Sequence, residues 1–183
     1  MALSEGLRMV EVRIHGRGGQ GVKKSAQVIA RAAYLSGFQT QDFAVYGAER
    51  QGAPVTSFVR IDRKPIELRG YIFEPDFIIV LDDTIERKKT LSGAKKEAKI
   101  LINSSEKSEK KNFWVLDATS IALQETGRQT ANIAMLGAFL KLFPKISFEK
   151  LEEAVKIELG TKKEDVISKN MNAARKCFEM VKL

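Results

Sequence analysis

The sequence has few residues of the kinds that build disulfides, metal centres or membrane spans. It holds one cysteine and one histidine among 183 residues. A single cysteine excludes an internal disulfide, a thiolate metal cage and the ligand set of an iron–sulfur cluster. No apolar run approaches the roughly 20 residues that a membrane-spanning helix needs, and the first six residues do not resemble a signal peptide. We therefore expect no metal site, no membrane association and a cytoplasmic location.

The length and composition are those of one ordinary globular domain. A chain of 183 residues can bury one good core but is short for two. Hydrophobic residues make up 44% of the chain and charged residues 30%, with no internal repeat or low-complexity linker. We predict a single domain that spans residues 1–183.

Positive charge is in excess, with a formal net charge of +8. Residues 86–111 alone hold nine Lys or Arg against four Asp or Glu. Nucleic-acid binding usually needs interleaved aromatic residues or a recognition motif, and this stretch has neither. We expect solvated helix faces or a docking surface for an acidic partner protein, and no nucleic acid.

The hydrophobic pattern predicts an α/β fold with a βαβ start. Residues 9–15 alternate like a strand, residues 20–36 have the period of a helix, and residues 38–46 form a second strand. A hairpin is expected next, with arms at 55–61 and 65–68.

The remaining pattern predicts a mainly parallel open sheet and a helical C-terminal third. The continuous apolar run 77–81 is typical of a strand covered on both faces, and a lysine-rich helix is expected after it. The further predicted elements are strands at 99–102 and 113–116, helices at 131–142 and 148–159, and a last helix that begins at a capping box in 161–164. The polar residues Asp82, Asp83, Asn103 and Asp117 follow predicted strands, so they should lie with the first loop at the carboxyl edge of the sheet, where ligands of such folds bind.

Four glycines fall within Gly16-Arg17-Gly18-Gly19-Gln20-Gly21, between the first strand and the first helix. This matches the dinucleotide-binding pattern G-x-G-x-x-G, and Asp42 follows at about the distance of the ribose-binding acid. Asp42, however, lies mid-strand, and a hairpin stands where a second βαβ unit would run. An NAD- or FAD-binding Rossmann domain is therefore the alternative hypothesis. A P-loop is excluded because Val22 occupies the position of its lysine.

Three cations converge on the start of the first helix. Lys23 and Lys24 lie in its first turn, where the helix dipole disfavours positive charge, and Arg17 precedes them without an acidic neighbour in sequence. A bound anion, either a ligand phosphate or the carboxylate of a partner, would relieve this conflict. The alternative is a turn used only for tight packing.

The chain shows no set of catalytic residues. His15 is expected to be a hydrogen-bonded loop residue rather than a base, and Cys177 shares an apolar helical stripe, which favours burial over nucleophilic use. Asp82 and Asp83 are more simply explained by capping of the following helix than by metal binding. The chain is therefore predicted to be a binding and assembly module.

Taken together, these motifs resemble the gamma subunit, or gamma domain, of the 2-oxoacid:ferredoxin oxidoreductases. The matching segments are His15–Gly21, Tyr46–Pro54, Val59–Asp62 with Lys64–Ile66, Asn132–Ala138 and Lys169–Asn170. The Gly-Ala-Pro form of the second segment is similar to separately encoded subunits of the pyruvate type. A branched-chain or other 2-oxoacid is the alternative within the family.

The resemblance implies a subunit of an enzyme that oxidatively decarboxylates a 2-oxoacid. In such enzymes the alpha and beta subunits hold thiamine diphosphate with Mg²⁺, [4Fe-4S] clusters in the beta and delta subunits pass electrons to ferredoxin, and coenzyme A takes the acyl group. This chain would supply assembly and contacts to coenzyme A phosphate or another subunit. The residues expected to do so are Gly16, Arg17, Gly18, Gly19, Gln20, Gly21, Lys23 and Lys24, with an interface at Tyr46, Glu49, Arg50, Gln51 and Gly52.

Overall fold

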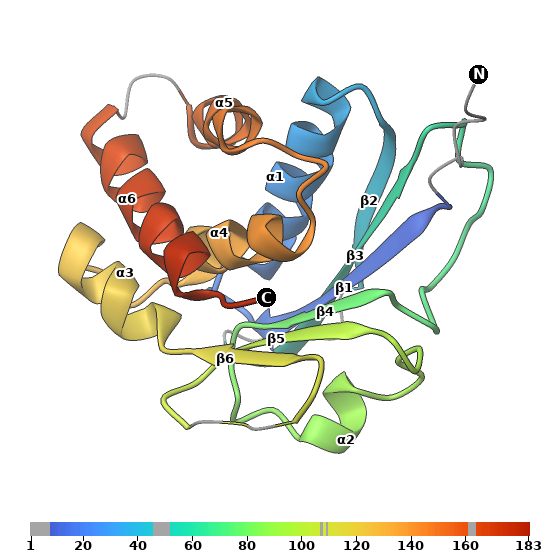
Figure 1. Cartoon of the computed structure of the whole chain (residues 1–183), viewed down its shortest axis with the longest axis horizontal. Helices are drawn as coiled ribbons and strands as arrows, with labels where there is room; N and C mark the ends of the chain where they lie inside the picture. Colours follow the sequence, from blue (N-terminus) through green and yellow to red (C-terminus); the bar gives the residue numbers. More distant parts are fainter. Residues whose placement is uncertain (1–7, 46–51, 107, 109, 161–163) are drawn as a thin grey trace.

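The computed structural model describes residues 8–45, 52–106, 108, 110–160 and 164–183. In chain order the elements are β1 Val10–Arg17, α1 Val22–Leu35, β2 Gln39–Val45, β3 Pro54–Asp62, β4 Phe77–Val80, α2 Arg87–Thr90, β5 Lys99–Asn103, β6 Phe113–Leu116, α3 Ala118–Thr126, α4 Asn132–Leu142, α5 Phe148–Leu159 and α6 Glu164–Met180. They form one α/β domain around a six-stranded sheet (Figure 1).

The strand order is β2-β3-β1-β4-β5-β6. The strands β1, β4, β5 and β6 pair in parallel, whereas β3 runs antiparallel to both of its neighbours, β2 and β1. The mainly parallel sheet and its strand–helix–strand start are therefore confirmed. The predicted hairpin is wrong in one arm, because β3 pairs with β2 and residues 65–68 form no strand. The antiparallel strand thus separates β1 from β2.

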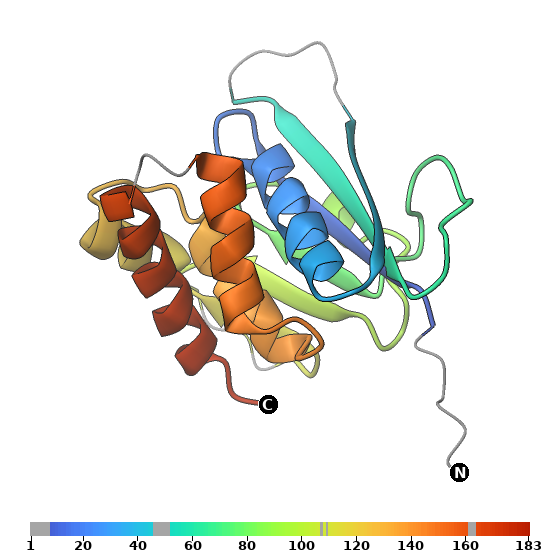
Figure 2. The same ribbon diagram turned by 90° about the horizontal axis from the view of Figure 1, so that it is seen from above.

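Helices cover one face of the sheet, and the other face has a much thinner cover. Figures 1 and 2 show α1, α3, α4, α5 and α6 together on one side, with α2 on the opposite side. The predicted lysine-rich helix is reduced to the four residues of α2. The apolar side chains accordingly form a large cluster between sheet and helices and a small one on the thinly covered face.

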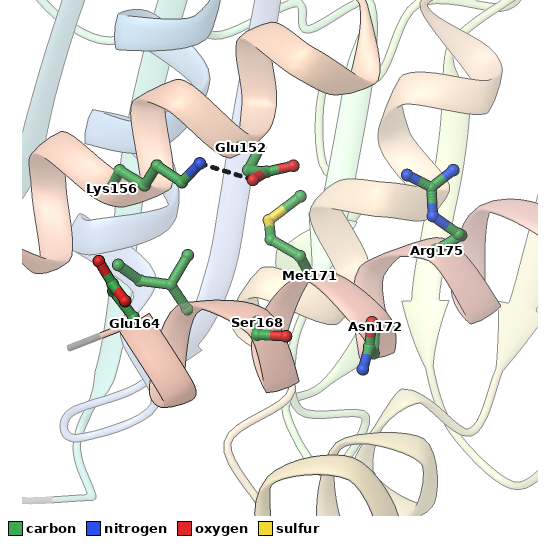
Figure 3. A pocket seen from close by; sticks show the side chains of 8 residues that line it. Glu152, Lys156, Glu164, Ser168, Met171, Asn172 and Arg175 are labelled. Carbon is green, nitrogen blue, oxygen red and sulfur yellow. Dashed lines mark ion pairs between the residues drawn. The ribbon is translucent and has the colours of Figure 1, made fainter. Parts of the chain in front are cut away.

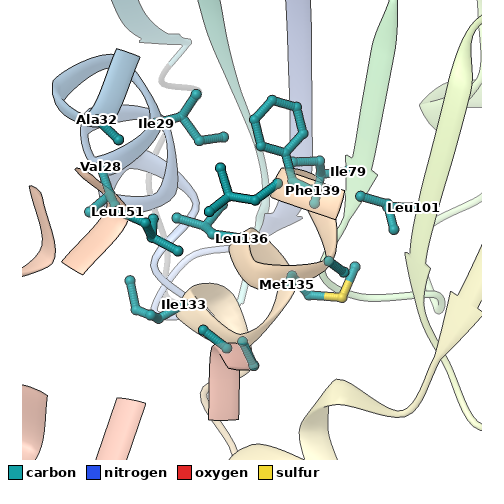
Figure 4. Packing of buried hydrophobic residues seen from close by; sticks show 14 of the residues in the cluster. Val28, Ile29, Ala32, Ile79, Leu101, Ile133, Met135, Leu136, Phe139 and Leu151 are labelled. Atoms are coloured by element: carbon teal, nitrogen blue, oxygen red, sulfur yellow. The ribbon is translucent and has the colours of Figure 1, made fainter. Parts of the chain in front are cut away.

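The helix α4 is the centre of the large core. Ten of its eleven residues are buried, because it lies between the sheet and α6. Figure 4 shows Phe139 and Leu136 of this helix packed toward the sheet strands and α1, and the Phe139 ring lies 5.2 Å from that of Phe77. Gly137 allows the backbones of α4 and α6 to touch, since a Cβ there would collide with the carbonyl oxygen of Ala174.

The C-terminal third is helical, as predicted, with one helix that the pattern did not predict. That helix, α3, begins where the Asp117 side chain accepts a hydrogen bond from the Ser120 N–H (2.9 Å) and ends at Gly127 with φ +72°. Its weak amphipathic pattern gave no periodic signal. In α5 the cap is Ser147. The predicted capping residues 161–163 lie outside the described part of the chain.

Candidate functional site

The glycine loop and the polar strand ends meet at the carboxyl edge of the parallel strands. A cavity of about 330 Å³ opens there. It is lined by Gln20, Leu81, Asp82, Asp83, Thr84, Asn103, Ser104, Ser105, Asp117 and Thr119. The prediction that these strand ends would converge is confirmed. Asn103 lies at its base, donating to the Leu81 carbonyl and to Thr119 Oγ1, so this wall of the cavity is fixed by buried hydrogen bonds.

The loop itself is tied to the start of β3. The N–H of Gly18 donates to the Ala53 carbonyl (2.9 Å), and the N–H of Gly52 donates to the Gly18 carbonyl (3.3 Å). Gly19 and Gly21 have φ of +94° and +76°, which L side chains rarely adopt. The glycines are therefore needed for the backbone path of this turn.

Gln20 and Asp82 hold the loop in place from inside. Gln20 accepts a hydrogen bond from the Arg17 N–H and donates to Asp82, both at 2.7 Å. Arg17 Nε lies 3.3 Å from Asp82 Oδ2. Burial alone would raise the pKa of Asp82, but hydrogen bonds from Thr84 and Gln20 and the Arg17 charge hold it below its usual value. Asp82 is thus an ionised counter-charge to the loop. It does not cap a helix, because α2 begins five residues later at Arg87.

The cations at the start of α1 also have acidic partners, contrary to the expectation from sequence. Lys24 Nζ lies 3.1 Å from Glu158 Oε2, and Arg31 pairs with the other oxygen of Glu158 at 3.3 Å. Lys23 interacts electrostatically with Asp42. These acids come from α5 and β2, so sequence proximity could not reveal them. The argument from unbalanced charge is wrong.

Asn132 belongs to the matching segment Asn132–Ala138, but the sequence assigned it no role at this edge. It opens α4, is 7% exposed, and its side-chain amide makes no hydrogen bond to any other group in the described residues. A Cβ on Gly21 would lie 2.5 Å from Asn132 Nδ2, so the amide packs directly against the N-cap of α1. Neither α1 nor α4 has a side-chain cap. Two helix N-termini and a free amide therefore converge on one point, which is a favourable environment for an anion.

Asp42 does not complete a dinucleotide site. It lies in the middle of β2, paired with Val59, which in turn pairs with Val12 in the middle of β1. The inserted β3 places Asp42 two strands from β1, about 10 Å away, and well before the carboxyl edge. Asp42 therefore has the sequence spacing of a ribose-binding acid but not its position in the fold.

The predicted interface falls mostly outside the described residues. The structure does not describe Tyr46, Glu49, Arg50 or Gln51. Gly52 is described, and its carbonyl accepts a hydrogen bond from Arg17 Nη1 (3.2 Å). This end of the predicted interface therefore contacts the glycine loop.

His15 and Cys177 are buried. His15 lies within β1 rather than in the loop, where its Nε2 accepts a hydrogen bond from Arg13 Nε (3.0 Å) and its Nδ1 lies 3.3 Å from Thr56 Oγ1. Burial and the Arg13 charge lower its pKa to about 4. Burial raises the pKa of Cys177 to about 12. The expected burial of Cys177 and hydrogen bonding of His15 are confirmed, whereas the expected place of His15 in the loop is wrong.

A second cavity, which the sequence did not predict, lies between α5 and α6. It has a volume of about 520 Å³, and Figure 3 shows Met171 at its centre with the ion pair of Lys156 and Glu152 (2.7 Å) on one side. The lining residues are Glu152, Lys156, Glu164, Ile167, Ser168, Met171, Asn172 and Arg175. Across the described ranges, no group of three or more His, Cys, Asp or Glu side chains could hold a metal ion, and no helix is long and apolar enough to span a bilayer.

A profile of the family "Pyruvate ferredoxin/flavodoxin oxidoreductase" matches residues 11–180. The chain belongs to this family. Together with the names of the relatives that follow, the profile confirms the resemblance to a gamma subunit and does not favour the NAD or FAD alternative. The pyruvate synthase subunit PorC of Methanocaldococcus jannaschii is 41% identical over 178 residues, covering 95% of this chain and 98% of that protein. The common subunit gamma of the pyruvate and ketoisovalerate oxidoreductases of Pyrococcus furiosus is 40% identical, covering 93% and 96%.

Solved structures show the same fold. The pyruvate oxidoreductase subunit PORC of Thermotoga maritima superposes with a TM-score of 0.83 at 33% identity, covering 96% of this chain and 98% of that one. A 2-oxoglutarate:ferredoxin oxidoreductase chain of Magnetococcus marinus, solved with coenzyme A bound, has a TM-score of 0.77 at 22% identity. This chain matches 32% of that longer chain, so the same domain fold also occurs as one part of a larger polypeptide.

Proposed function

We propose that this chain is the gamma subunit of a multi-subunit pyruvate:ferredoxin oxidoreductase, which converts pyruvate, coenzyme A and oxidised ferredoxin to acetyl-coenzyme A, CO₂ and reduced ferredoxin. The names of relatives that span nearly the whole chain support it. The Pyrococcus relative is named as common to a pyruvate and a ketoisovalerate enzyme. A subunit shared between enzymes does not select the 2-oxoacid, so a branched-chain enzyme is the second candidate.

In this proposal the chain assembles with alpha, beta and delta subunits in the cytoplasm and does not perform the redox chemistry itself. Its one cysteine cannot supply the four thiolates of a [4Fe-4S] cluster. Thiamine diphosphate with Mg²⁺ and the clusters belong to the other subunits, and ferredoxin meets the complex there. Tyr46 and the segment 49–52 are proposed as part of the subunit interface.

The role of the chain's own site is to hold a phosphate of coenzyme A at the glycine loop. The observation that carries this role is the amide of Asn132, which makes no hydrogen bond within the described residues and lies between the uncapped N-termini of α1 and α4. The N–H groups of Gly19, Gly21 and Val22, which find no acceptor within the described residues, and the Asn132 amide would donate to phosphate oxygens. Arg17, Lys23 and Lys24 add positive potential around the site, although each has an acidic partner in this structure.

Replacing Asn132 by aspartate tests this role in the assembled complex. The substitution keeps the shape of the side chain, and two helix N-termini tolerate its charge, but the carboxylate repels a phosphate. We expect the KM for coenzyme A to rise about 10-fold or more, a loss of about 1.4 kcal/mol of binding, while kcat and assembly stay unchanged. Asn172→Asp, on the exposed side of α6, is the matched control. An unchanged KM in a folded N132D complex would contradict the phosphate role, and failure of the wild-type chain to assemble with thiamine diphosphate-binding subunits would contradict the subunit assignment.

A further inference from the structure

The face of the sheet opposite the main helix layer carries a row of aromatic side chains. Phe43 on β2 stacks against Phe58 on β3 with ring centroids 4.9 Å apart, Tyr71 lies 5.9 Å from Phe58, and Phe73 lies 6.2 Å from Tyr71. Tyr71 and Phe73 are 52% and 72% exposed, and Leu68, three residues earlier, is 53% exposed. A contiguous exposed apolar cluster of this kind marks an interaction surface more often than scattered apolar residues do.

The segment that presents these rings is held by two buried arginines. Arg60 Nη2 donates to the carbonyl oxygens of Gly70 (3.0 Å) and Tyr71 (3.4 Å). Arg13 Nη1 donates to the next two carbonyls, of Ile72 and Phe73, both at 3.4 Å. Arg60 and Arg13 are only 2% and 7% exposed. Four successive backbone carbonyls are therefore fixed against the sheet, although residues 70–73 belong to no strand.

The direction of the side chains follows from this clamp. Ile72 is 2% exposed and points into the protein, so its neighbours Tyr71 and Phe73 point outward. Arg13 Nη2 also donates to the carbonyls of Thr90 (3.0 Å) and Ser92 (2.5 Å), which ties the α2 region to the same point. A shallow cavity of about 340 Å³ lies between the rings and the floor formed by Arg13 and other residues of β1 and β3.

Burying a guanidinium is costly unless all of its hydrogen bonds are made. Here two such groups are used to immobilise a loop whose outward side chains are aromatic. A rigid aromatic pair loses little conformational entropy on binding, and aromatic anchors of this kind dominate protein–protein interfaces. The arrangement is therefore suited to docking another protein.

The charges around the aromatic pair favour one kind of partner. The segments 64–74 and 86–89, which include or adjoin the rings, carry five Lys or Arg and three Asp or Glu, and Lys89 lines the cavity beside the rings. A second copy of this chain, docked about a two-fold axis, would set this cationic rim against itself. A partner whose apolar centre is rimmed by carboxylates would instead gain both contact and charge complementarity.

We propose that the face formed by Phe43, Phe58, Tyr71 and Phe73 docks another subunit of the enzyme complex through an apolar patch with an acidic rim. This inference rests on the proposed function, since it takes the partner from the same complex. It adds a defined surface made of aromatic side chains, which shares no residue with the predicted interface at Tyr46 and residues 49–52.

The test is co-expression with the thiamine diphosphate-binding subunits and quantitative assembly of purified components. Tyr71→Ser with Phe73→Ser is expected to weaken assembly at least about 30-fold, the effect of losing one hot-spot residue. The control pair is Ile157→Ser with Met180→Ser, which are 49% and 55% exposed on α5 and α6 and should assemble normally. Thermal unfolding of each isolated variant reports whether the fold is kept.

Single substitutions at the most exposed ring test the acidic rim. Phe73→Asp should weaken assembly more than Phe73→Lys, because only the aspartate repels carboxylates. Normal assembly of the serine pair and of Phe73→Asp would overturn the docking face and leave the subunit assignment standing, whereas a wild-type chain that does not assemble at all would overturn both. A dimer of the isolated wild-type chain that the serine pair dissociates would also overturn the proposal, since the occupant would then be a second copy.

Discussion

Gly21→Ala is expected to damage the candidate phosphate site through a steric clash with Asn132. Alanine substitutions at two other glycines separate this clash from the strain of the backbone conformation. Gly19, Gly21 and Gly37 have φ of +94°, +76° and +85°, so alanine is strained at all three. Only Gly21 has a neighbour in the space where the methyl group would go. There the new Cβ would lie 2.5 Å from Asn132 Nδ2 and 2.9 Å from Asn132 Cγ, whereas Gly19 and Gly37 have nothing within 4 Å.

The magnitude follows from these two contributions. Alanine with positive φ costs about 1–2 kcal/mol, offset by about 0.4–1 kcal/mol from the lower entropy of the unfolded chain. Gly19→Ala and Gly37→Ala should therefore lower the free energy of unfolding by about 1 kcal/mol. At Gly21 the Asn132 side chain must also move away from the new methyl group, which adds about 1–3 kcal/mol. The expected total for Gly21→Ala is about 2–4 kcal/mol.

Urea unfolding of the three alanine variants measures the difference. A double-mutant cycle with Asn132→Ala tests the cause of this difference. Removing the amide should restore most of the additional free energy of unfolding that Gly21→Ala loses, and should restore none of the free energy that Gly19→Ala loses. In the assembled complex, Gly21→Ala should also raise the KM for coenzyme A more than Gly19→Ala does. If Gly21→Ala were no less stable than Gly19→Ala, and the cycle showed no coupling, the close packing of loop and amide would be refuted.

Two further predictions concern the core and the sheet. Gly137→Ala should lower the free energy of unfolding by about 2 kcal/mol or more, because the new Cβ collides with the Ala174 carbonyl. This loss is expected even though alanine favours helices over glycine by about 1 kcal/mol. Urea unfolding measures the change, and a more stable variant would contradict the tight crossing of α4 and α6. His15 has a folded pKa of about 4, below its usual 6.5, so its contribution is fully present above pH 6.5 and is lost as pH falls toward 4, by up to about 3 kcal/mol. Unfolding measured from pH 7 to 4.5 should show a flatter pH dependence in His15→Gln than in wild type; equal slopes would argue against a neutral, buried imidazole.

The sequence allowed the strands and most helices to be predicted because their signals are local. Val12 and Ile14 alternate with polar residues in β1, and the apolar stripe of α1 recurs with helical period. The place of β3 between β1 and β2 could not be predicted in this way. Strand order depends on which distant edges pair, and the short run 65–68 is as plausible a local partner for β3 as the true one.

The location of the site could be predicted from the sequence, but the ion pairs and packing contacts that stabilise it could not. The glycine loop and the ends of β4 and β5 follow from the pattern of a parallel sheet. The acids that balance Lys24 and Arg17 are Glu158 and Asp82, more than 60 residues away in each case, and sequence gives no sign of such pairs. Asn132 was visible in the sequence as the first residue of a family motif and of a helix, but its packing against Gly21 was not, because that is a tertiary contact.

The burial of α4 has a consequence for synthesis on the ribosome. Its most apolar faces are covered by the sheet, which is complete by residue 116, and by α6, which begins at residue 164. A nascent chain that has emerged only through α5 therefore still exposes the side of α4 that α6 will cover. Such a chain is open to aggregation and to chaperones, and the core of α4 is completed only when α6 arrives.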